Sequence, residues 1–159
     1  MLYRAILFLL VSCVPAVTVL GAENAPWGHA KLTPTQYKPM KVVYDVTTGD
    51  QAELEHVLDR ASYLSKLTGV DPFEQSIVLV LHGSSVKFFA IKNFARYEDL
   101  QRRAQSLKVG SLIQFRMCKL AAEGQGFAPG DIQGFVERVP MGDAEIVRLQ
   151  YEEGHAYMQ

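Results

Sequence analysis

Residues 77–81 read Ile-Val-Leu-Val-Leu, five apolar residues in succession. A short apolar run rich in β-branched residues is typical of a strand that is buried on both faces of a parallel sheet. The run stops at His82, and the turn-forming residues Gly-Ser-Ser follow at 83–85. This stretch therefore predicts a central strand that places a histidine at its carboxyl end.

The segment before this strand predicts a further strand and a helix. Residues 41–46 (KVVYDV) are rich in β-branched residues and favour a strand. Asp50 and Glu53 have the spacing of a helix-capping box. From Leu54 onward, apolar residues recur at the intervals of an amphipathic helix, which we expect to close at Gly69.

The segments after residues 77–81 continue the alternation of helices and strands. The patterns predict a short helix over 86–91, an amphipathic helix over 97–107, strands over 111–117 and 135–139, a helix over 143–152 and a closing strand over 156–158. Alternating strands and helices predict βαβ units. We therefore expect a three-layer α/β sandwich, with helices on both faces of a mainly parallel sheet of about five strands.

Composition argues for one ordinary globular domain and against several functions. The chain has 159 residues and a net charge of −1. It contains no block of basic residues of the kind that would predict nucleic-acid binding. The four histidines lack the spacing of metal ligands, and no CxxC pair is present. Gly124-Gln-Gly126 lacks the third glycine of a dinucleotide fingerprint. We expect no metal and no cofactor.

The first residues have the layout of an export signal. A positive start at 1–4 precedes an apolar stretch over 5–20, and small residues follow at 21–22. This layout predicts a secretory signal over 1–22, an extended proline-containing leader over 23–40, the folded domain over 41–159, and a periplasmic location. A membrane anchor is disfavoured because the run is short and Pro15 interrupts it. Lipidation at Cys13, within a lipobox-like Leu-Val-Ser-Cys, is the other alternative.

Cys118 is the candidate reactive residue. Once a signal over 1–22 is removed, it is the only cysteine left in the chain. It follows a predicted strand, and a helix starting at Lys119 would place it at a helix N-terminus, which favours an anion such as a thiolate. His82 ends a neighbouring strand, so both residues should reach the same sheet edge. The alternatives are a buried space-filling cysteine and a capping or hydrogen-bonding histidine.

Two aspartates near the end of the first strand receive structural interpretations. Asp45 is interpreted as a turn residue, and Asp50 is interpreted as a helix cap.

Several segments together resemble one protein family. Leu79-Val-Leu-His-Gly83, the strand ending at Cys118, the run from Val139 to Gln150, and Gly154-His-Ala-Tyr157 are similar to the DsrE/DsrF-like sulfur-relay proteins, over residues 41–158. The resemblance implies a small α/β domain that assembles into trimers or hexamers. It also implies that a cysteine after a central strand accepts sulfur as a persulfide and passes it on, and Cys118 matches that position.

These observations predict a periplasmic sulfur-relay protein that carries sulfur on Cys118, with His82 as a possible auxiliary residue. Its expected partners are a sulfur-donor protein, a sulfur-acceptor protein and further copies of the same chain. The alternative is an oligomeric binding or scaffold module of the same fold with an inert, buried cysteine. Large aromatic residues in loop-like or terminal segments predict an interface between copies, the alternative being that they fold back over the core, and the family resemblance implies that the assembly is a trimer or hexamer. These residues are Tyr37, Phe88, Phe89, Phe94, Phe127 and Tyr157.

Overall fold

The computed structural model describes residues 28–67, 74–110 and 112–159. The predicted signal over 1–22, with Cys13, lies outside these residues. Residues 28–40 of the predicted leader contain no helix or strand. The chain divides into two units, Met1–Thr35 and Gln36–Gln159, and the second contains every helix and strand of the described residues.

A five-stranded, fully parallel sheet forms the centre of the second unit. Its order is β4-β3-β2-β1-β5, so the chain moves stepwise from β1 to β4 and then returns to the other side of β1. The prediction of about five mainly parallel strands is confirmed. The strands are β1 (Lys41–Val46), β2 (Ser76–Leu81), β3 (Ile113–Cys118), β4 (Glu137–Val139) and β5 (Ala156–Met158).

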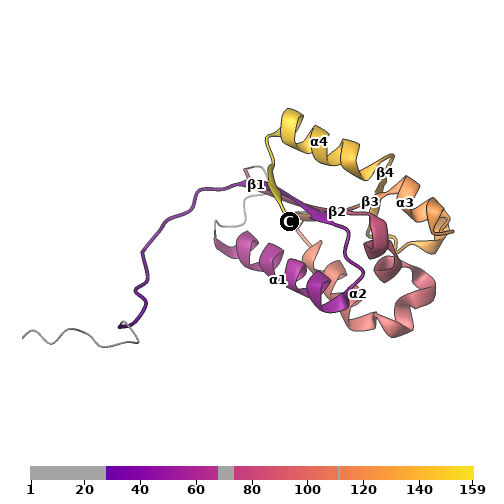
Figure 1. Cartoon of the computed structure of the whole chain (residues 1–159), viewed down its shortest axis with the longest axis horizontal. Coiled ribbons are helices and arrows are strands. Elements are labelled where there is room, and N and C mark those ends of the chain that lie inside the picture. The colour runs from indigo at the N-terminus through magenta and orange to yellow at the C-terminus, as the bar shows by residue number, and fades with distance from the viewer. Residues whose placement is uncertain (1–27, 68–73, 111) are drawn as a thin grey trace, which may run out of the picture. The chain divides into compact units, whose positions relative to one another are not determined.

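Helices cover both faces of the sheet, which confirms the three-layer α/β fold. Figure 1 shows α1 (Gln51–Leu67) and α2 (Glu98–Leu107) on one face and α4 (Gly142–Glu153) on the other. The short α3 (Lys119–Gly124) follows β3 directly. Within the described ranges, no helix is long and apolar enough to span a membrane.

The helix predicted over 86–91 is wrong in type and extent. The chain instead forms two 3-10 helices, η1 (Gly83–Phe89) and η2 (Ile91–Arg96), and a third, η3 (Pro129–Asp131), lies further on. Ala90 separates the first two because its backbone is extended and forms an antiparallel bridge with Ile132. A contact 42 positions away in sequence therefore interrupts the helix, and local periodicity cannot reveal such a contact.

The larger hydrophobic core lies between the sheet and the face covered by α1 and α2. It includes Phe88, Phe89 and Phe127, which are at most 6% exposed. Three of the six aromatic residues that supported an oligomer interface are therefore core residues. Tyr37 and Tyr157 are exposed, and Phe94 is half-buried.

The core under α4 is much smaller. It consists of Val43, Val78 and Val80 from the sheet with Ile146 and Leu149 from the helix. These three valines belong to the central strands β1 and β2, which the helix crosses. Because so few apolar residues hold α4, polar contacts are needed to fix its N-terminal end.

Candidate functional site

Four side chains from four adjacent strands line up across the carboxyl edge of the sheet, on the face that α4 covers. Val43 and Val80 face α4, and alternation along each strand puts Asp45 and His82 on that face too. Tyr157 of β5 pairs with Val43 of β1, so the two residues lie on the same face. Arg116 bonds Glu145 of α4 and therefore faces this helix, and Cys118, two residues further along β3, lies on the same face. The row therefore runs Tyr157, Asp45, His82, Cys118.

A hydrogen-bonded cluster forms the first three positions of this row. His82 Nε2 lies 2.5 Å from Asp45 Oδ1, and the Tyr157 hydroxyl donates to Asp45 Oδ2 at 2.8 Å. The second bond raises the pKa of Tyr157, because the phenol loses its carboxylate partner when it ionises. A carboxylate can only accept, so Nε2 carries a proton and Nδ1 of the neutral ring is an acceptor.

The pairing with Asp45 fixes the orientation of His82. The two side chains are only 16% and 21% exposed, so water competes weakly for the bond. The main chain of His82 is held as well. Ser85 Oγ donates to the carbonyl of His82 at 2.8 Å and to the carbonyl of Val46, at the end of β1, at 2.7 Å. The imidazole is therefore held in one orientation rather than free to rotate at the surface.

Cys118 ends β3 and caps α3. Its sulfur accepts a hydrogen bond from the Ala121 amide at 3.4 Å, and its backbone is extended as at an ordinary N-cap. The residue is only 6% exposed. The predicted position at the start of a helix beginning at Lys119 is confirmed, but β3 reaches one residue further than predicted and includes Cys118 itself. It is the only cysteine of the described residues, and it is free.

Gly142, the first residue of α4, lies against both His82 and Cys118. A Cβ on this glycine would lie 3.3 Å from Cys118 Cβ, 3.3 Å from His82 Cβ and 3.2 Å from His82 Cγ. Both side chains therefore flank the same point, and the start of α4 covers them. The register agrees, because Leu81 pairs with Met117 and the next residues are His82 and Cys118.

An ion network holds this end of α4 against the sheet. Glu145 of α4 bonds Arg116 of β3 and also Arg148, the latter at 2.8 Å. Hydrogen bonds from Arg148 and then from Arg116 lower the pKa of Glu145 against the opposing effect of its burial. Because Arg116 is two residues before Cys118, the network links the helix to the strand that carries the thiol.

The interpretation of Asp45 as a turn residue is wrong. Asp45 lies inside β1, and its side chain pairs with His82. The interpretation of Asp50 as a helix cap is confirmed, because its Oδ1 accepts from the Glu53 amide at 3.0 Å. Sequence reasoning also missed Tyr157 and Gly142. The alternation of residues 43 and 45 in a strand was the available signal for Asp45.

The described residues contain no group of three or more His, Cys, Asp or Glu side chains arranged to hold a metal ion. The cluster around Cys118 instead combines a thiol, an imidazole, a carboxylate and a phenol. Such a set can transfer protons and form a covalent bond to sulfur.

Comparison with known proteins supports the fold. No protein-family model matches the chain, and no curated protein matches it. A solved structure, the protein of unknown function MTH1491 from Methanobacterium thermoautotrophicum, is similar with a TM-score of 0.59 and 21% sequence identity. The match covers 75% of this chain and 97% of that chain. It supports an α/β fold and says nothing about activity.

Proposed function

We propose that this chain is a sulfur carrier that holds sulfane sulfur as a persulfide on Cys118, as the resemblance to DsrE/DsrF-like sulfur-relay proteins implies. The observation that carries the proposal is the placement of the thiol beside a fixed His82–Asp45 pair at the carboxyl edge of the sheet. In parallel α/β sheets, chemistry takes place at this edge.

The transfer requires no oxidant or reductant. The Cys118 thiol gives its proton to Nδ1 of His82, and the thiolate attacks the terminal sulfur of a donor persulfide. A bond forms between Cys118 Sγ and that sulfur, and the donor's own S–S bond breaks. The electron pair leaves on the donor thiolate, which accepts the proton from His82. Delivery repeats the exchange, with an acceptor thiolate as nucleophile and Cys118 as leaving group.

Two features of the site suit this exchange. The Ala121 amide points at Cys118 Sγ and stabilises the negative charge that develops on the sulfur when it leaves. Asp45 stabilises the imidazolium that forms on His82. The low exposure of Cys118 would also protect a persulfide from water and oxidants.

The same low exposure favours a second candidate function. A cysteine that is 6% exposed can simply fill space, and the domain would then be a binding or scaffold module of the same fold. The two functions differ in whether the thiol reacts in the folded protein.

Mass spectrometry of the folded protein without residues 1–22, in which Cys118 is the only thiol, separates the two candidates. We expect iodoacetamide to modify Cys118 without denaturant, and we expect a low-molecular-weight persulfide to add the mass of one sulfur atom. Cys118→Ser should show neither change. Modification that occurs only after denaturation would contradict the sulfur carrier and favour the scaffold.

We further propose that the protein is exported to the periplasm after cleavage of residues 1–22. Sequencing the N-terminus of the mature protein tests this. A start at Glu23 supports cleavage by a signal peptidase, whereas a lipid on Cys13 supports a lipoprotein.

A further inference from the structure

The sulfur chemistry leaves unused a pocket of about 260 Å³ at the carboxyl end of β1. The pocket arises from a difference in strand length. β5 pairs with β1 only as far as Met158, opposite Tyr44, whereas β1 continues to Val46. In the described part of the chain, the last residues of β1 therefore have no strand neighbour on this side. Gln159, directly after β5, lines the space that results.

The pocket lies at the point where the sheet changes its winding direction. From β1 the chain crosses by way of α1 to β2 on one side, and from β4 it crosses by way of α4 to β5 on the other. The two crossover helices lie on opposite faces (Figure 1). The carboxyl ends of β1 and β5 thus flank a topological switch point, where open α/β sheets bind their ligands.

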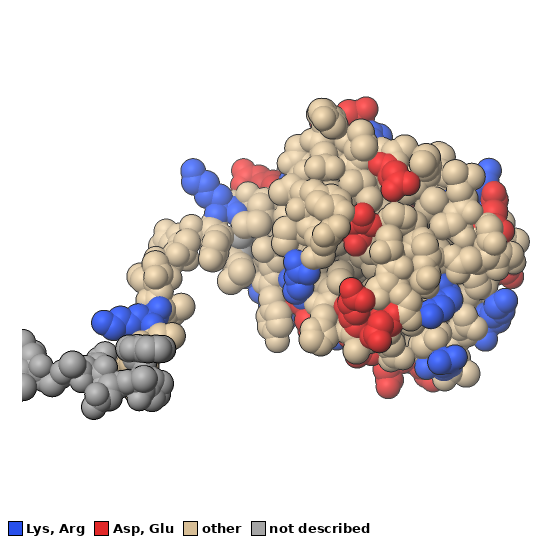
Figure 2. All heavy atoms as spheres, in the orientation of Figure 1, with Lys and Arg blue, Asp and Glu red and all other residues tan. Residues whose placement is uncertain are grey.

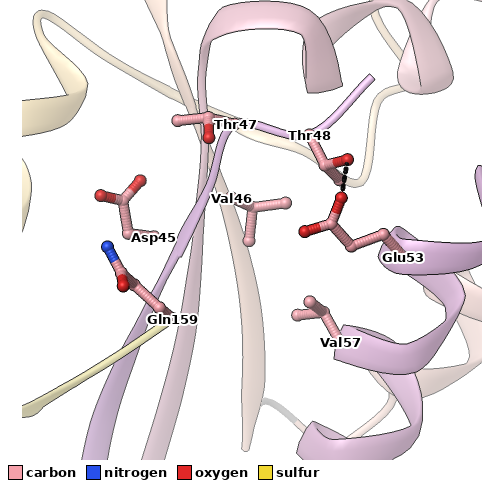
Figure 3. A pocket seen from close by; sticks show the side chains of 7 residues that line it. All are labelled: Asp45, Val46, Thr47, Thr48, Glu53, Val57 and Gln159. Carbon is pink, nitrogen blue, oxygen red and sulfur yellow. Dashed lines mark hydrogen bonds between the residues drawn. The ribbon is translucent and has the colours of Figure 1, made fainter. Parts of the chain in front are cut away.

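The lining combines polar and apolar side chains. Figure 3 shows Asp45 and Gln159 on one side of β1, and Thr48, Glu53 and the apolar Val46 and Val57 on the other. Thr48 donates its hydroxyl hydrogen to Glu53 at 2.5 Å and accepts from the Asp50 amide at 3.0 Å, so this threonine holds the Glu53 carboxylate at the pocket. No Lys, Arg or His is among the described residues that line the pocket.

The polar groups of this lining are mostly acceptors of hydrogen bonds. Asp45 accepts one bond at each carboxylate oxygen, and Glu53 accepts one from Thr48. Each carboxylate oxygen has two acceptor positions, so both groups can accept more. Figure 2 shows acidic side chains gathered over the start of α1. A ligand that donates hydrogen bonds and carries positive charge would complement this lining.

We propose that this pocket binds a small primary ammonium compound with a short aliphatic chain. The ammonium group donates hydrogen bonds to the carboxylate of Glu53, and the carboxylate of Asp45, across β1, adds negative charge to the same lining. The aliphatic chain packs on Val46 and Val57. The pocket volume of about 260 Å³ is roughly that of eight water molecules in the liquid, so the ligand must be small. Because Asp45 belongs both to this lining and to the His82 pair, the bound ligand would lie beside the thiol's base.

Titration of isotope-labelled protein with n-butylammonium, followed by NMR, tests the proposal. We expect saturable shifts of the Thr47, Thr48 and Glu53 amides. Butyrate and 1-butanol have the same chain without the positive charge and should cause no saturable shift at equal concentration. Shifts of equal size with all three probes, or no saturable shift with the ammonium, would overturn the proposal.

Two charge-neutralising variants on α1 show whether the pocket carboxylate is responsible. Glu53→Gln should weaken butylammonium binding roughly tenfold, as expected for the loss of one charged hydrogen-bond partner. Glu55→Gln is the matched control, because Glu55 lies on the same helix and bonds Gln51 outside the lining. Equal weakening by both variants would contradict the site.

A cysteine variant separates this inference from the sulfur carrier. Cys118→Ser should bind n-butylammonium with unchanged affinity, because the thiol does not line the pocket. Binding by this variant would support the pocket even if the thiol proved inert.

Discussion

At the scale of single residues, Asp45 determines what His82 can do. By accepting from Nε2, it leaves Nδ1 of the neutral ring as an acceptor. The Tyr157 hydroxyl occupies the other Asp45 oxygen and holds the carboxylate in place. The resulting arrangement resembles the carboxylate–imidazole pairs that activate nucleophiles in enzymes, where the carboxylate orients the ring.

The first prediction concerns His82 as the base for Cys118. Glutamine at position 82 keeps a donor for Asp45 but offers no basic nitrogen. We expect His82→Gln to slow persulfide formation on Cys118 at pH 7 roughly a hundredfold, the lower range for a positioned base. The rate is measured by quenching and mass spectrometry. His56→Gln, on the exposed side of α1, is the control, and a rate for His82→Gln within about twofold of wild type would contradict the role.

The second prediction concerns Gly142. A methyl group there would lie within 3.3 Å of carbon atoms of both His82 and Cys118, so these side chains must shift. We expect Gly142→Ala to slow iodoacetamide labelling of Cys118 several-fold and to lower the free energy of unfolding by about 1 kcal/mol. Gly124→Ala is the matched control, because an added Cβ at position 124 has no neighbour within 4 Å. Equal labelling rates in both variants would show that Gly142 does not shape the site.

At the scale of elements, α4 connects the stability of the fold to the site. Its apolar contact with the sheet involves only Ile146 and Leu149 among its own buried hydrophobic residues. Glu145 adds the bonds to Arg116 and Arg148. The same helix begins at Gly142, which covers the thiol, so loosening the ion network should also loosen the cover over Cys118.

The third prediction concerns this ion network. Glu145 is 9% exposed, and Arg116 would lose its charged partner in Glu145→Gln. We expect the free energy of unfolding at pH 7, measured with urea, to fall by about 2 kcal/mol. Glu152→Gln is the control, because Glu152 contacts Arg148 at 3.7 Å and is largely exposed. A loss as small as that of the control would contradict the importance of the network.

The same residue makes stability depend on pH in the acid range. The pKa of Glu145 is lowered from its ordinary value of 4.5 in the folded protein. Its contribution is therefore present above pH 4.5 and is lost as the pH falls through the lower folded value. The wild-type protein should lose more stability between pH 5 and pH 3 than Glu145→Gln does. Parallel pH curves for the two proteins would be inconsistent with this linkage.

At the scale of the whole molecule, the fold could be predicted because local patterns agree with it. The apolar run at 77–81 and the β-branched run at 41–46 form the central strands, and the periodic segments form α1 and α2. The 3-10 helices η1 and η2 could not be predicted in the same way. They depend on the bridge between Ala90 and Ile132, which joins segments far apart in sequence.

The candidate site could be predicted only in part, for the same physical reason. Cys118 and His82 could be proposed from the sequence because each stands where an apolar run stops. The role of Asp45 could not be predicted, although the residue lies in the predicted strand over 41–46, because its partners His82 and Tyr157 are distant in sequence. Their meeting depends on the strand order β2-β1-β5, which a pattern of alternating elements does not encode.

The last prediction concerns self-association. Phe88, Phe89 and Phe127 no longer support an interface, since they belong to the core. The remaining argument is the exposed apolar surface beside the thiol. Leu120, two residues after Cys118, is 58% exposed, and Met141, next to Gly142, is 42% exposed. A neighbouring subunit that covered them would form one wall of a cleft around Cys118.

Light scattering on the protein without residues 1–22 measures this assembly. We expect a trimer or hexamer, and we expect Leu120→Asp to shift it toward monomers by placing a charge on the proposed interface. The fold should tolerate this change, because an acidic residue is favourable in the first turn of a helix. Tyr63→Ser, which removes an exposed aromatic ring from α1, should leave the mass unchanged. A wild-type mass of one subunit that persists at high concentration would show that the thiol is covered by its own chain alone.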